Sequence, residues 1–168
     1  MSPILNEDSL SFVSRSEEQT RRLGTRLGLL LEKGDIICLE GPLGSGKTCF
    51  VQGIGKGMGI KEPITSPSFI LISEYHPSPS TPPLYHIDFY RLENPVKEAL
   101  ALGIEEYFYG EGVCVIEWAE RAKEIIPPQR MWITFKYVGP THRHLLMEAQ
   151  GERYRELLRL FRRSAFGV

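Results

Sequence analysis

The chain carries the stretch Gly41-Pro42-Leu43-Gly44-Ser45-Gly46-Lys47-Thr48, which fits the pattern G-x-x-x-x-G-K-[ST] of a phosphate-binding P-loop. The glycines allow the backbone to turn tightly and to direct successive N–H groups at a phosphate. The lysine adds a mobile positive charge for the β- and γ-phosphates, and the threonine hydroxyl is suited to ligate Mg²⁺. We therefore expect a nucleotide phosphate site formed by Leu43, Gly44, Ser45, Gly46, Lys47, Thr48 and Cys49.

The sequence on both sides supports this interpretation. Residues 35–40 are mostly apolar and predict a strand that leads into the loop, and residues from Thr48 to about Met58 predict a helix that leaves it. Strand, loop and helix in this order are the context that the motif requires. Four glycines in the helix, at 53, 55, 57 and 59, lower its intrinsic stability, which suggests close packing of the helix against a neighbour.

Length and composition indicate one domain over residues 1–168. The chain has 168 residues, 42% of them hydrophobic and 24% charged, as in ordinary globular proteins. Its net charge of −1 gives no overall attraction to nucleic acid or to anionic membranes. We expect a cytoplasmic protein without a membrane segment, because we find neither a secretory signal nor a long apolar run. Its three cysteines lie in apolar runs without a C-x-x-C pair, which favours buried, reduced thiols.

The remaining periodicity predicts an α/β fold of the P-loop NTPase type, a three-layer sandwich with a mixed, mostly parallel central sheet flanked by helices. A capping box at Ser16 and Gln19 starts the first helix, and Gly34 is its expected stop. The N-terminal residues and the Pro-rich loop 77–83 are expected to be poorly ordered. The other predicted elements are strands over 69–75, 84–90, 113–116, 131–137 and 143–149 and helices over 95–102, 119–125 and 153–163.

Two acidic residues are candidates for the chemistry beside the loop. Glu117 follows a buried, β-branched strand, and ligands of open α/β sheets collect at the carboxyl ends of such strands, so Glu117 is the expected Mg²⁺-side acid with Thr48. Asp88 shares one strand face with His86 and Tyr90 at a spacing of two residues. Three roles for Asp88 are open: orienting the attacking water, contacting a metal-bound water, or anchoring Arg91. For His86 we favour a structural, hydrogen-bonded role.

Two further segments have alternative interpretations. The polar run that begins Thr65-Ser66-Pro67 is either a loop that senses the γ-phosphate or a plain turn before a strand. For the arginine-rich segment 153–163 we favour a solvated helix face, and the alternative is a contact surface for RNA or an acidic partner.

The chain resembles the TsaE family, also called YjeE, the small bacterial P-loop ATPases of tRNA threonylcarbamoyladenosine synthesis. The resemblance extends from about Ser16 to Gly151. The ordered set is specific, whereas a P-loop alone is shared by very many NTPases. It rests on five segments: the P-loop at 41–48, Thr-Ser-Pro-Ser-Phe at 65–69, Glu-Tyr at 74–75, His-Ile-Asp-Phe-Tyr-Arg-Leu at 86–92, and Ile-Glu-Trp-Ala-Glu-Arg at 116–121.

The resemblance implies ATP and Mg²⁺ as cofactors. By analogy, Lys47 and its loop hold the ATP phosphates, Thr48 and Glu117 hold the metal, and Asp88 is the further acid needed for hydrolysis. Thr65, Ser66 and the residues up to Phe69 form a switch-like loop, and Trp118 lies beside the site. The family also implies a partner, the TsaD–TsaB complex that modifies adenosine 37 of tRNA. Hydrolysis would reset that complex between cycles, so contact with tRNA would be indirect.

Three positions of the loop depart from the family's usual sequence. Pro42 replaces an aspartate, Ser45 an alanine, and Cys49 a second threonine; the backbone N–H cradle at 44–48 is kept. We also expect slow hydrolysis by the protein alone, since no arginine is placed by sequence as an arginine finger in cis. The alternatives are a small-molecule kinase of the same fold and a nucleotide-gated binding module. A GTPase is disfavoured by the absence of an Asn-Lys-x-Asp run.

Overall fold

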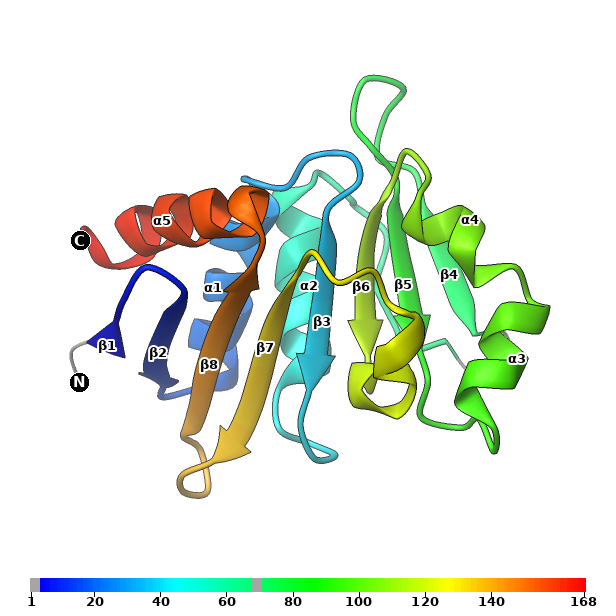
Figure 1. Cartoon of the computed structure of the whole chain (residues 1–168). Coiled ribbons are helices and arrows are strands. Elements are labelled where there is room, and N and C mark those ends of the chain that lie inside the picture. The colour runs from blue at the N-terminus through cyan, green and yellow to red at the C-terminus, as the bar shows by residue number, and fades with distance from the viewer. Residues whose placement is uncertain (1–3, 68–70) are drawn as a thin grey trace.

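The computed structural model describes residues 4–67 and 71–168, and these residues form three layers (Figure 1). Its strands are β1 (Ile4–Leu5), β2 (Ser9–Ser14), β3 (Ile36–Glu40), β4 (Ile72–Tyr75), β5 (Leu84–Asp88), β6 (Val113–Glu117), β7 (Arg130–Tyr137) and β8 (Arg143–Gln150). Its helices are α1 (Glu17–Gly28), α2 (Lys47–Gly57), α3 (Pro95–Ala101), α4 (Ile104–Phe108), the 3₁₀ segment η1 (Ala119–Ile125) and α5 (Glu152–Phe166). This arrangement is the α/β sandwich that the sequence predicts.

Across the described residues, the strands form one sheet in the order β1-β2-β8-β7-β3-β6-β5-β4. The centre is parallel, because β3 pairs in parallel with both β6 and β7, and β5 pairs in parallel with β6. The flanks are antiparallel, including the β4–β5 hairpin around loop 77–83. The carboxyl ends of β3, β5, β6 and β7 meet at one edge of the sheet, the lower edge in Figure 1. This edge carries the P-loop.

Each face of the sheet has its own apolar core. Alternate side chains of β3 separate accordingly: Ile37 and Leu39 pack with α1, α2 and α5, whereas Ile36 and Cys38 pack with α3, α4 and η1. A strand covered on both faces reads as a continuous apolar run, which explains why β3 and β6 were recognisable in the sequence. Cys38 and Cys114 are buried thiols and Cys49 is half-buried; all three are free, as expected.

The helices α1 and α2 approach each other through glycines. A Cβ on Gly24 would lie 2.3 Å from the backbone oxygen of Phe50, and one on Gly28 would lie 2.2 Å from that of Ile54. Gly53 and Gly57 face the backbone of α1 at similar distances. The glycines of the P-loop helix therefore permit the close packing that the sequence suggested, and the helix ends at Gly57.

The first helix ends earlier than predicted. The Ser16 hydroxyl accepts a hydrogen bond from the Gln19 N–H at 3.0 Å, as expected of a cap, but α1 stops at Gly28 rather than at Gly34. The guanidinium of Arg153, on α5, donates to the backbone oxygen of Leu30 at 3.0 Å and to both carboxylate oxygens of Asp35. Arg153 thus stabilises a turn where the leucine pattern favoured more helix.

Other boundaries also shift. The predicted strand 69–75 begins at Ile72 in the structure, with residues 69 and 70 outside the described residues, and the predicted strand 84–90 ends at Asp88. The sequence did not predict β1, β2 or α4. Whether the N-terminal residues and loop 77–83 are poorly ordered stays a prediction, with residues 1–3 outside the described range. None of the described helices is both long and apolar enough to cross a membrane.

Candidate functional site

The P-loop connects β3 to α2 through two left-handed glycines. Gly44 has φ 74° and Gly46 has φ 103°, a region that a side chain with a Cβ rarely adopts. Gly46 precedes α2 and provides no side-chain cap, so the first N–H groups of the helix, beginning at Lys47, are left for a ligand. The loop and the helix terminus together form a cradle for an anion.

Lys47 is buried within this cradle, with 5% of its surface exposed. Its Nζ donates to the backbone oxygens of Gly41 and, at 3.2 Å, of Pro42. The same ammonium lies 4.0 Å from the ring centroid of Trp118, in a cation–π contact. Burial lowers the pKa of Lys47, and the nearby Glu117 carboxylate opposes that shift. The Lys47 ammonium thus lies near the acids at the ends of β5 and β6.

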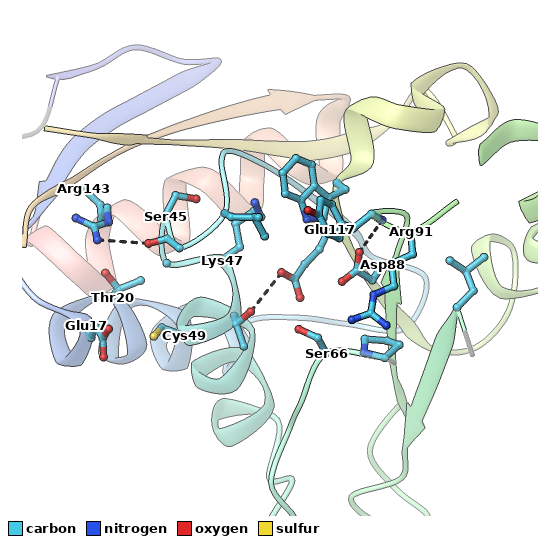
Figure 2. A pocket seen from close by; sticks show the side chains of 18 of the residues that line it. Glu17, Thr20, Ser45, Lys47, Cys49, Ser66, Asp88, Arg91, Glu117 and Arg143 are labelled. Carbon is cyan, nitrogen blue, oxygen red and sulfur yellow. Dashed lines mark hydrogen bonds between the residues drawn. The ribbon is translucent and has the colours of Figure 1, made fainter. Parts of the chain in front are cut away.

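Thr48 and Glu117, the two residues predicted to hold the metal, lie together at the mouth of the loop (Figure 2). The Thr48 hydroxyl, in the first turn of α2, lies 3.5 Å from Oε1 of Glu117 at the end of β6. The second carboxylate oxygen of Glu117, Oε2, lies 2.6 Å from Nε2 of His86. Hydroxyl and carboxylate oxygens are the ligands that Mg²⁺ takes together with water, so this pair fits a magnesium ion.

Asp88 lies beside Glu117, because the two residues are paired across the parallel β5–β6 ladder. Its carboxylate accepts a hydrogen bond from the N–H of Tyr90 at 2.8 Å. Burial raises the pKa of Asp88, and the Glu117 charge adds to this effect, while the Tyr90 N–H and the charge of Lys47 oppose it. The structure thus brings together Asp88 and Glu117, the two acids that the sequence predicted to lie beside the P-loop.

Trp118 makes the corner after Glu117. It adopts a left-handed backbone (φ 58°, ψ 37°) and is the one non-glycine residue with positive φ in the described ranges. Its ring stacks on that of Tyr90 with 4.8 Å between centroids. A left-handed conformation at a bulky residue is a strained feature of the kind that clusters at functional sites. This conformation places the indole between Lys47 and the chain that leaves β5.

A cavity of about 1000 Å³ surrounds these groups. Its described lining comprises residues 15–17, 20, 43–49, 66–67, 71, 88, 90–92, 98, 101–102, 117–118, 140–141 and 143. The predicted phosphate-binding residues, both acids and Trp118 are all among them. Of the predicted switch loop, Ser66 lines the cavity, whereas Thr65 is exposed and does not; Ser68 and Phe69 lie outside the described residues.

Sequence reasoning missed the support that the loop receives from the β7–β8 hairpin. The Tyr137 hydroxyl donates to the backbone oxygen of Leu43, and Arg143 donates to that of Gly44 at 3.3 Å. The guanidinium of Arg143 also lies over the Tyr137 ring, 4.5 Å from its centroid. No local pattern marks either residue, because each acts on a loop more than ninety positions away in sequence.

Arg121 supports the chain that follows Asp88 at the end of β5. From the segment after β6, it donates to the backbone oxygens of Phe89 at 2.8 Å, Tyr90, and Leu92 at 2.6 Å. Three carbonyl acceptors on one guanidinium fix the turn that follows Asp88. This arginine is thus engaged with backbone and holds the wall of the cavity.

Comparisons with known proteins agree with this geometry. The family model described as "Threonylcarbamoyl adenosine biosynthesis protein TsaE" matches residues 14–145. A TsaE protein from Treponema pallidum (strain Nichols) is 44% identical over 133 residues, covering 79% of this chain and 96% of that protein. A second, from Bacillus subtilis (strain 168), is 40% identical over 140 residues, covering 83% and 85% of the two chains.

The fold is also similar to a solved structure. The crystal structure of YdiB from Bacillus subtilis superposes with a TM-score of 0.77 and 34% sequence identity, and the match covers 97% of both chains. The likeness thus includes both flanks of the sheet as well as the P-loop. With the family match over residues 14–145, it shows that this chain belongs to the TsaE family.

Proposed function

We propose that this protein is a Mg²⁺-dependent ATPase of the machinery that makes threonylcarbamoyladenosine at adenosine 37 of tRNA. Membership of the TsaE family supports the pathway. The observation that carries the chemistry is the 3.5 Å approach of the Thr48 hydroxyl to the Glu117 carboxylate at the mouth of a P-loop. A P-loop threonine next to a strand-end acid is the ligand pair that P-loop NTPases present to magnesium.

Thr48 and Glu117 would hold the metal through their oxygens. When bound, Mg²⁺ would supply positive charge that offsets the negative charge developing on the phosphate oxygens. The N–H groups at the start of α2 would bind the same phosphates, and the Lys47 ammonium would join them by leaving the Gly41 and Pro42 oxygens and the Trp118 ring.

Asp88 is the group proposed to position the attacking water. It lies beside Glu117 on the next strand, partly buried, and its raised pKa makes its carboxylate a better proton acceptor than a free aspartate. The hydrogen bond from the Tyr90 N–H engages one carboxylate oxygen of Asp88, and the residue lines the cavity. Water attack on the γ-phosphorus with release of ADP and phosphate is the reaction that this arrangement supports.

We further propose that hydrolysis is slow without a partner and is stimulated by the TsaD–TsaB complex, which the ATPase resets between cycles. Arg121 and Arg143 both donate to backbone carbonyls, which disfavours either as an arginine finger. The engagement of Arg121 also argues against the kinase alternative, in which an arginine of this region would close over the phosphates. With a net charge of −1, contact with tRNA is proposed to pass through the complex.

The test is phosphate release by the wild type and by Lys47→Ala, each with and without TsaD–TsaB. We expect weak activity alone, stimulation by the complex, and loss of both in Lys47→Ala. Lys56→Ala is the matched control, because Lys56 is exposed on the same helix. Hydrolysis by Lys47→Ala at the wild-type rate within the complex would contradict the proposal.

A further inference from the structure

His86 is a buried, hydrogen-bonded residue, as the sequence predicted, and its partner is the acid of the candidate site. Its side chain has no exposed surface, and Glu117 has 3%. The two side chains come from neighbouring parallel strands and share the sheet face that packs on α1 and α2. Their closest atoms, Nε2 of His86 and Oε2 of Glu117, are 2.6 Å apart, which is a short and strong hydrogen bond.

The direction of this bond follows from the other ring nitrogen. Nδ1 of His86 is buried and has no hydrogen-bond partner within the described residues. A buried N–H without an acceptor is rarer and more costly than an acceptor without a donor. The neutral ring with its proton on Nε2 leaves only an acceptor unpaired. His86 therefore donates from Nε2, and Glu117 accepts as a carboxylate.

The bond restricts how Glu117 meets its other neighbours. With Oε2 held by His86, the carboxylate plane is fixed and Oε1 is the oxygen that faces Thr48. Without the imidazole, Oε2 would be a buried charged oxygen lacking a donor, and rotation of the side chain would relieve that cost. The position of the Glu117 Oε1 relative to the Thr48 hydroxyl therefore depends on His86, which is not among the described residues that line the cavity.

We propose that His86 is a positioning residue that orients Glu117 for a divalent cation at Thr48, an inference that rests on the proposed function. Residues that hydrogen-bond to a metal ligand fix its orientation, and their loss typically weakens metal affinity by roughly 10–100-fold. His86 thus acts on metal affinity through the orientation of Glu117, whereas a residue that only filled the core would matter through its volume alone.

The experiment is an electron paramagnetic resonance titration of Mn²⁺ into the ADP complex, which needs no turnover. His86→Leu replaces the imidazole with an apolar side chain and removes the donor, and we expect Mn²⁺ affinity to fall by roughly 10–100-fold. His86→Gln places an amide N–H near the former Nε2 position and should restore most of that loss. ADP affinity in EDTA should be unchanged in both. Cys38→Ala, another buried substitution in the central sheet, is the control for general destabilisation.

A measurement on the wild type keeps the inference testable if a variant fails to fold. Nitrogen-15 spectra of the histidine ring should show the proton on Nε2; a proton on Nδ1 would overturn the inference. So would His86→Leu with wild-type Mn²⁺ affinity, or failure of His86→Gln to restore it. Those results leave the proposed function standing, whereas a wild type whose ADP complex binds no Mn²⁺ overturns both.

Discussion

A Cβ placed on Gly53 would lie 2.0 Å from the backbone oxygen of Arg21. The contact is backbone against backbone, so no side-chain rotation relieves it. We expect Gly53→Ala to destabilise the protein by about 1–3 kcal/mol or more, because α2 must move away from α1. Chemical unfolding measures the change. Since Thr48 lies in the first turn of α2, we expect ATP affinity to fall together with stability.

Gly55→Ala is the matched control on the same helix. Its Cβ would meet the terminal methyl of Ile64, which is the flexible end of a side chain. Alanine is the better helix former by roughly 1 kcal/mol, which offsets the adjustment of Ile64. Equal losses for the two variants would contradict a special role for the backbone contact between Gly53 and Arg21.

Tyr137→Phe should weaken ATP binding without unfolding the protein. The substitution removes the hydroxyl that donates to the Leu43 oxygen and keeps the ring on which Arg143 lies. One hydrogen bond contributes about 1 kcal/mol, so a loss of about fivefold in affinity is expected. Calorimetric titration measures it. Tyr109→Phe, at an exposed tyrosine away from the cavity, should bind as wild type; an unaltered Tyr137→Phe would mean that the hairpin does not support the loop.

Arg121→Lys should loosen the turn after Asp88. A lysine lacks the planar fork that reaches Phe89, Tyr90 and Leu92 together. We expect a loss of about 2–3 kcal/mol and faster amide hydrogen exchange over residues 89–92. Arg159→Lys, at an exposed position on α5, should change neither quantity. Unchanged exchange at 89–92 would rule out the holding role of Arg121.

Asp88→Asn should separate stability from activity. Burial raises the pKa of Asp88, so its ionised form costs the native state free energy at pH values above that pKa, and the cost vanishes as the pH falls through it. The amide of the variant would keep an acceptor for the Tyr90 N–H without the charge. Asp88→Asn should therefore melt above the wild type at pH 7, with the difference shrinking toward pH ~4.

Hydrolysis by Asp88→Asn should meanwhile fall by roughly 10²–10⁴-fold, as expected when a proton acceptor is removed. Asp8→Asn, at an exposed aspartate, should change neither melting nor rate. A variant that is less stable than the wild type at pH 7 would contradict the direction of the pKa shift.

The parts that sequence predicted are those with local causes. The P-loop pattern, the apolar runs of β3 and β6, and the acids at strand ends each follow from neighbours in the chain. Parallel pairing then brought Asp88 beside Glu117, because carboxyl ends of parallel strands share an edge. The role of each residue in catalysis stays a prediction.

The parts that sequence did not predict depend on distant contacts. The turn after α1 is stabilised by Arg153, which donates a hydrogen bond to the Leu30 oxygen from 123 positions away. Arg143 and Tyr137 support the P-loop from the β7–β8 hairpin, and the periodicity of the sequence does not indicate contacts between segments so far apart. In β2, buried and half-buried residues alternate because one face of the strand packs on the core. Its serines weaken this alternation in the sequence, and its place in the sheet depends on pairing with the distant β8.

The strand order has a consequence for how the protein is made. The P-loop strand β3 lies between β6 and β7, which leave the ribosome only after a further seventy residues or more. Until then the nascent loop has neither Glu117 nor Arg143 beside it, and β3 has no strand on either side. Long-range parallel pairing is slow because the connecting chain must close before contacts form. We therefore expect nucleotide to assist folding only late in synthesis, once the C-terminal half has emerged.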